Sequence, residues 1–164
     1  MIALVKVDPY HPVTGLLVPF LCRRIMDMAA SRQEERDPQQ YTRDIMSRLW
    51  AQDPSLGVLA MLDEKGRLVG HAVATIETDG KNHWLFVQQT KADGDVGDAV
   101  DRAMGEAKAW AAQVSETLVK VGFRPITKGL MVTTRSDAAW QRRHKLRAIR
   151  HVMEFELTEE REGA

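Results

Sequence analysis

The sequence predicts a single α/β domain with a mixed, mostly antiparallel central sheet flanked by helices. The clearest observation is residues 57–77, "GVLAMLDEKGRLVGHAVATIE", in which two apolar runs flank a turn where Gly66 can take a positive φ, as in a β-hairpin. A second is residues 83–90, "HWLFVQQT", an almost continuously apolar run typical of a strand buried on both faces. A third is the recurrence of apolar residues every three or four positions over residues 96–114, which indicates a helix.

The segment before the hairpin predicts one strand and two helices. Residues 2–7 form a short β-rich run. Apolar residues then recur at helical spacing over residues 13–28, and we expect the regular helix to begin or kink at Pro19 because proline disrupts a helix interior. Asp37 is expected to cap a second helix, with Gln40 completing a capping box.

The segment after the long helix predicts a strand, a helix and a final strand. Residues 129–136, "GLMVTTRS", read as a strand. Ser136 or Asp137 is then placed to cap a helix over about residues 138–147. Residues 151–157, "HVMEFEL", alternate between apolar and polar, as a half-exposed strand does. The predicted order is therefore β-α-α-β-β-β-α-β-α-β.

Length and composition predict one globular domain, residues 1–157, followed by a flexible acidic tail, residues 158–164. Lys plus Arg equals Asp plus Glu, at 23 each, so the overall charge favours neither a nucleic-acid nor a membrane partner. A single cysteine excludes an internal disulfide, and no apolar run reaches the length of a membrane span. The five histidines are scattered, so no metal site is expected. We expect a cytoplasmic protein, or one within an assembled particle.

The stretch from residue 88 to 110, "QQTKADGDVGDAVDRAMGEAKAW", reads as a strand end, a glycine-bearing turn and a helix. Together with the element order, it resembles the GNAT superfamily of acetyl-CoA-dependent N-acetyltransferases over nearly the whole chain. In that family the turn and the helix start hold the cofactor pyrophosphate through backbone N–H groups and the helix dipole. The resemblance implies acetyl-CoA as cofactor, with contacts from Val87, Gln89, Ala92, Asp95, Val96 and Gly97.

Several positions depart from the family pattern. With the loop aligned on "ADGDVG", Asp95 stands where glycine is usual and Ala92 where glutamine or arginine is usual. On the later helix, Asp137 takes the place of an asparagine and His144 that of a tyrosine. The connection over residues 114–128, "VSETLVKVGFRPITK", is longer than is usual in the family.

The turn also carries three carboxylates, Asp93, Asp95 and Asp98. If they face a bound pyrophosphate, like-charge repulsion exceeds the attraction of the helix dipole. The alternative is that Asp93 or Asp95 is the N-cap of the helix and Asp98 a first-turn acid, so that the helix supplies its own anion. At the level of sequence a working phosphate loop also stays open, if the aspartates point away from the phosphates. The carboxylates therefore favour weak cofactor binding or none without excluding binding.

The chemistry implied by the resemblance requires a base for the amine and an acid for the leaving thiolate. His144 is the candidate acid, because imidazole can donate a proton near neutral pH. Glu77, at the end of a strand, is the candidate base. Each has a simpler interpretation: His144 as a surface histidine on a basic helix, and Glu77 as a solvated carboxylate.

The segment over residues 138–150 is unusually basic for this chain, with five Arg or Lys residues. A solvated helix face explains it most simply, but it is also the expected site for a protein partner or a homo-oligomer contact. A nucleic acid is a weaker alternative because Trp140 is the only aromatic residue there.

We therefore expect a GNAT-like N-acetyltransferase relative whose transfer of acetyl from acetyl-CoA to an amine is weak or lost. The alternative is a non-catalytic GNAT-fold component of a larger assembly, such as a phage particle.

Overall fold

A computed structural model describes residues 1–31, 37–80, 82–94, 98–132, 142, 147–149 and 152–157. The elements, in chain order, are β1 (Ala3–Lys6), the 3-10 helix η1 (Thr14–Leu17), α1 (Val18–Ser31), α2 (Pro38–Trp50), β2 (Leu56–Leu62), β3 (Leu68–Asp79), β4 (Asn82–Ala92), α3 (Ala99–Lys120), β5 (Lys128–Val132), β6 (Arg147–Ile149) and β7 (Val152–Glu156). No helix in the described part of the chain combines the length and apolarity needed to cross a membrane.

The strands are hydrogen-bonded in the order β1-β2-β3-β4-β5-β7-β6. The β1–β2, β5–β7 and β6–β7 pairs are antiparallel, whereas β4 and β5 are parallel. The predicted α/β class with a mixed sheet is therefore confirmed. The chain forms two compact units, residues 1–74 with 89–103 and residues 75–88 with 104–164, and β3, β4 and α3 each contribute to both.

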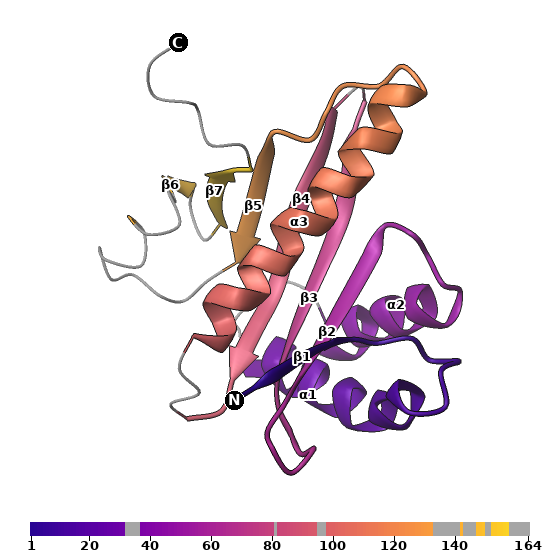
Figure 1. Cartoon of the computed structure of the whole chain (residues 1–164), viewed down its shortest axis with the longest axis vertical. Coiled ribbons are helices and arrows are strands. Elements are labelled where there is room, and N and C mark those ends of the chain that lie inside the picture. The colour runs from indigo at the N-terminus through magenta and orange to yellow at the C-terminus, as the bar shows by residue number, and fades with distance from the viewer. Residues whose placement is uncertain are drawn as a thin grey trace. The chain divides into compact units, whose positions relative to one another are not determined.

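The first unit has two apolar clusters on opposite faces of its strands. One cluster joins the buried residues of α1 and α2, which lie side by side (Figure 1), to Val58, Ala60 and Val73. The other joins Met61 and Ala72 to the first turns of α3. Neighbouring strand residues thus enter different clusters, as expected where side chains alternate across a sheet.

The helix starts largely follow the predicted signals. The Asp37 carboxylate accepts hydrogen bonds from the backbone N–H of Gln39 at 2.8 Å and of Gln40 at 3.4 Å, which confirms the N-cap of α2. The predicted capping box is wrong, because the Gln40 amide donates to Asp44 at 2.8 Å, one turn ahead. The regular helix α1 begins at Val18, next to Pro19, as predicted.

The predicted hairpin over residues 57–77 is confirmed. Gly66 has a φ of +73°, and its N–H donates to the Asp63 carbonyl at 2.9 Å. The Asp63 carboxylate also accepts from the backbone N–H of Lys65 and Arg67, both at 2.9 Å. These bonds to Arg67 and Lys65 hold the pKa of Asp63 below its ordinary value.

In the second unit, β5 is packed tightly against β7. Gly129 lies opposite Phe155, and a Cβ at Gly129 would overlap the Phe155 ring. The Lys108 ammonium of α3 stands 5.6 Å from the centre of the same ring. The absence of a side chain at Gly129 therefore lets Phe155 bury itself to 1% exposure.

The end of the chain departs from the prediction. The final strand is confirmed as β7, but Arg147 belongs to strand β6 and not to a helix. The physical reason is pairing, because β6 forms an antiparallel hairpin with β7, with Ile149 opposite Val152. Most of the predicted basic helix and all of the acidic tail lie outside the described residues.

Candidate functional site

The turn between β4 and α3 has the predicted strand–turn–helix arrangement. After β4 ends at Ala92, the Asp93 N–H donates to the Val69 carbonyl at 2.7 Å, and Gly94 takes a φ of +60°. Helix α3 begins at Ala99, and the Arg102 N–H makes its first backbone bond to the carbonyl of Asp98 at 2.9 Å. Three predicted cofactor-contacting residues lie outside the described residues, namely Asp95, Val96 and Gly97.

The N-cap position of α3 belongs to Asp98, so the predicted capping role of Asp93 is wrong. The Asp93 carboxylate is instead bound by the guanidinium of Arg24 from α1. Nη1 contacts Oδ2 and Nη2 contacts Oδ1, both at 2.9 Å, a bidentate ion pair. The hydrogen bond from Arg24 is the main cause that holds the pKa of Asp93 below its ordinary value, and the charges of Lys91 and His71 act in the same direction.

A buried polar pair lies on β3 and β4 in the same unit. His71 and Gln89 are 0% and 1% exposed, and His71 Nε2 lies 2.8 Å from Gln89 Oε1. The Gln89 amide nitrogen donates to the carbonyl of Ile25 in α1 at 3.1 Å. Because that bond fixes the amide orientation, Gln89 presents an oxygen to His71, and His71 must carry a proton on Nε2.

Sequence reasoning missed Arg24 and His71. The signal for His71 was available, because it is a polar residue in the middle of an apolar strand and Gln89 is another in the next predicted strand along the chain. Two such residues on paired strands are candidates for a buried hydrogen bond. Arg24 gave no comparable signal, since an arginine on an amphipathic helix is ordinary.

The other predicted site residues are placed as follows. Glu77 is exposed near the end of β3, and Val87 is 2% exposed where β4 pairs with β5. Ala92 is half-buried at the end of β4. His144 lies outside the described residues. Since the Gln89 side chain is occupied by His71 and Ile25, only its backbone remains for a ligand.

The described residues around the turn fit a pyrophosphate weakly. Arg24 is bound to Asp93, and the Arg102 guanidinium donates to the Ile2 carbonyl at 2.7 Å. Lys91 is the exposed cation beside the turn, whereas Asp98 and Asp101 add negative charge at the helix start. The helix start and Lys91 favour an anion, and the two acids oppose it. Within the described ranges, no three His, Cys, Asp or Glu side chains gather closely enough to hold a metal ion.

Comparison with known proteins places the fold. No protein-family model matches the sequence, and none of the curated proteins matches it. An acetyltransferase of the GNAT family from Staphylococcus aureus Mu50 is 10% identical, with a TM-score of 0.62 over 96% of this chain and 100% of its own. Arabidopsis thaliana NAA60, solved with a bisubstrate analogue, is 10% identical, with a TM-score of 0.59 over 95% and 97%. Glucosamine-6-phosphate N-acetyltransferase from Arabidopsis thaliana is 6% identical, with a TM-score of 0.58 over 92% and 94%. The chain therefore has the fold of the GNAT-family N-acetyltransferases.

Proposed function

We propose that the chain is a GNAT-type acyltransferase that binds acetyl-CoA weakly and transfers its acetyl group to an amine. The observation that carries the proposal is the ion pair between Arg24 and Asp93 beside the strand–turn–helix segment. This ion pair weakens the objection to an anion at the turn, because the charge of Asp93, one of the three carboxylates there, is shared with a guanidinium.

The weak affinity follows from the remaining charges. The pyrophosphate would be held by the turn, by the first backbone amides of α3 and by Lys91. Asp98 and Asp101 stand at the same helix start and repel it. Acetyl-CoA, when bound, supplies an acetyl group activated as a thioester, so the protein itself has only to orient the amine and move protons.

Two residues are proposed for the proton transfers. The Glu77 carboxylate, exposed on β3, accepts the proton that the amine loses as it attacks. His144 donates a proton to the leaving sulfur. Replacing either residue, as Glu77→Gln or His144→Phe, is expected to lower turnover about 100-fold. A variant that keeps full turnover removes that residue from the proposal.

The binding step is tested by calorimetric titration with acetyl-CoA at low salt. We expect a submillimolar Kd, and Asp98→Asn is expected to tighten it about two- to fivefold, because asparagine has nearly the same size and loses the charge. Asp27→Asn removes the same charge from an exposed position on α1 and serves as the matched control. The proposal fails if neither the parent nor Asp98→Asn binds acetyl-CoA at millimolar concentration.

A second candidate function is a non-catalytic role in assembly, favoured by exposed apolar side chains. Val13, Leu16 and Phe20 are 66%, 72% and 65% exposed, and their spacing along η1 and α1 puts them on one helical face. We propose that this face meets a second copy of the chain. Light scattering should then detect a dimer that Leu16→Ser with Phe20→Ser converts to a monomer, and a monomeric parent would exclude this role.

A further inference from the structure

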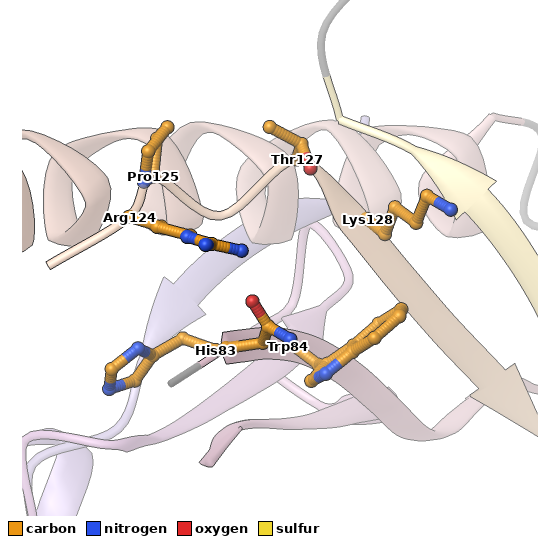
Figure 2. Close-up of a pocket in the computed structure, with 7 residues that line it drawn as sticks. His83, Trp84, Arg124, Pro125, Thr127 and Lys128 are labelled. Carbon is orange, nitrogen blue, oxygen red and sulfur yellow. The ribbon is translucent and has the colours of Figure 1, made fainter. Parts of the chain in front are cut away.

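A cavity of about 340 Å³ lies in the second unit, between the start of β4 and the start of β5. Figure 2 shows its lining residues, among them His83, Trp84, Arg124, Pro125, Thr127 and Lys128. Residues 124–127 belong to the connection between α3 and β5. This connection therefore forms one wall of a cavity that the proposed acetyl transfer does not use.

This wall is anchored at both ends. Gly122, with a φ of +91°, ends α3, and the Phe123 N–H turns back to the Leu118 carbonyl at 2.9 Å. Further along, the Ile126 N–H donates to the buried Ser115 hydroxyl at 2.7 Å, and Ile126 is 3% exposed. Arg124 stands between these two fixed points, so its backbone is preorganised.

The cavity has two basic lining residues. Arg124 and Lys128 line it, and no acidic side chain is among its lining residues. Figure 2 shows the Arg124 guanidinium extending over the backbone of His83 and Trp84. Arg124 forms no hydrogen bond or ion pair with any residue that the structure describes. An exposed guanidinium without a partner, on a fixed backbone, is available to bind a phosphate or carboxylate.

Trp84 and His83 project their rings in opposite directions from neighbouring positions of β4 (Figure 2). The half-buried Trp84 ring forms part of the lining, and the His83 ring packs edge-on against Phe123 with centroids 5.4 Å apart. His83 Nδ1 is buried and has no hydrogen-bond partner among the described residues. The volume is within the range of small-molecule sites, and such sites combine an aromatic wall with a few polar groups that fix orientation.

We propose that this cavity binds a small molecule in which a planar ring carries a phosphate or a carboxylate. The ring stacks on Trp84, and the anionic group is bound by Arg124. The function proposed for this cavity differs from that of the turn before α3, and its ligand needs no acetyl group. The proposal stands or falls independently of acetyl transfer.

The test follows the indole N–H resonance of Trp84 in ¹⁵N-labelled protein, identified by its loss in Trp84→Phe. The probes are indole-3-acetate for the carboxylate and 1-naphthyl phosphate for the phosphate, with indole-3-acetamide and inorganic phosphate as controls. We expect at least one ring-bearing anion to shift the resonance with a submillimolar Kd. The neutral amide and inorganic phosphate should bind at least tenfold more weakly.

Arg124→Gln should weaken the binding of the ring-bearing anion at least tenfold, whereas Lys120→Gln, an equal loss of charge on an exposed position of α3, should leave it unchanged. Unchanged Trp50 and Trp110 resonances will show that each variant is folded. The proposal is overturned if neither ring-bearing anion shifts Trp84, if the amide binds equally well, or if Arg124→Gln binds as tightly as the parent.

Discussion

Arg24 and Asp93 are 69 residues apart in sequence, yet two hydrogen bonds of 2.9 Å join their side chains. The pair ties α1 to the turn that precedes α3, and it neutralises the acid closest to the end of β4. Arg24 is 21% exposed and Asp93 53%, so solvent screens the pair and its contribution to stability is modest.

Asp93→Asn should lower the free energy of unfolding by up to about 1 kcal/mol at pH 7. The folded-state pKa of Asp93 lies below its ordinary value of 3.8, so the stabilisation is complete above pH 3.8 and disappears as the pH falls through the folded-state value. Urea unfolding at pH 7 and at acidic pH should therefore show the gap between parent and variant closing on acidification. A gap that widens at low pH would contradict the assignment, and Asp27→Asn provides the control.

Replacing Gln89 by leucine should lower the free energy of unfolding by more than the loss of a surface contact does. It leaves the Ile25 carbonyl and the His71 Nε2–H without a partner in the core, and each buried unsatisfied group costs about 1–3 kcal/mol. Chemical denaturation should show a loss of about 2–5 kcal/mol. Gln113→Leu, on an exposed position of α3, is the matched control. Equal stability of the two variants would mean that the His71–Gln89 hydrogen bond is not formed.

Gly70 and Gly105 should respond oppositely to substitution by alanine. A Cβ at Gly70 would lie 2.5 Å from Met61 Sδ and 2.6 Å from the Lys91 carbonyl, so the strands must shift at a cost of about 1–3 kcal/mol. Nothing lies within 4 Å of a Cβ at Gly105, inside α3, where alanine should stabilise the helix by about 0.5–1 kcal/mol. Thermal unfolding of the two variants distinguishes the outcomes, and a neutral Gly70→Ala would show that β3 and β4 are less closely packed.

Ser115→Ala tests the anchor of the cavity wall. Its hydroxyl accepts the Ile126 N–H at 2.7 Å, and the loss should destabilise the protein by about 1–3 kcal/mol. It should also weaken binding of a ring-bearing anion, since Arg124 would no longer be held in place. Ser47→Ala, exposed on α2, should change stability by less than about 0.5 kcal/mol. Unchanged stability of Ser115→Ala would show that Ile126 is held by packing alone.

Site features that depend on neighbouring residues in the sequence were predicted, whereas those that depend on distant residues were not. The strand–turn–helix segment was predicted because a short turn between two periodic stretches is a local pattern. The partner of Asp93 was not predicted. An aspartate at that position could either cap the helix or form an ion pair. It forms the ion pair because α1 brings Arg24 next to it. The roles proposed for Glu77 and His144 stay predictions.

Features that depend on neighbours within a few positions could be predicted from the amino-acid sequence. The Asp37 cap and the Gly66 hairpin follow from local hydrogen bonds and from permitted φ values. Three features required the folded chain: the contact of Arg24 with Asp93, the pairing of Arg147 in a strand, and the cavity wall formed by the α3–β5 connection. These contacts join residues far apart in sequence or depend on strand register, and no local periodicity specifies which distant partner a side chain will reach.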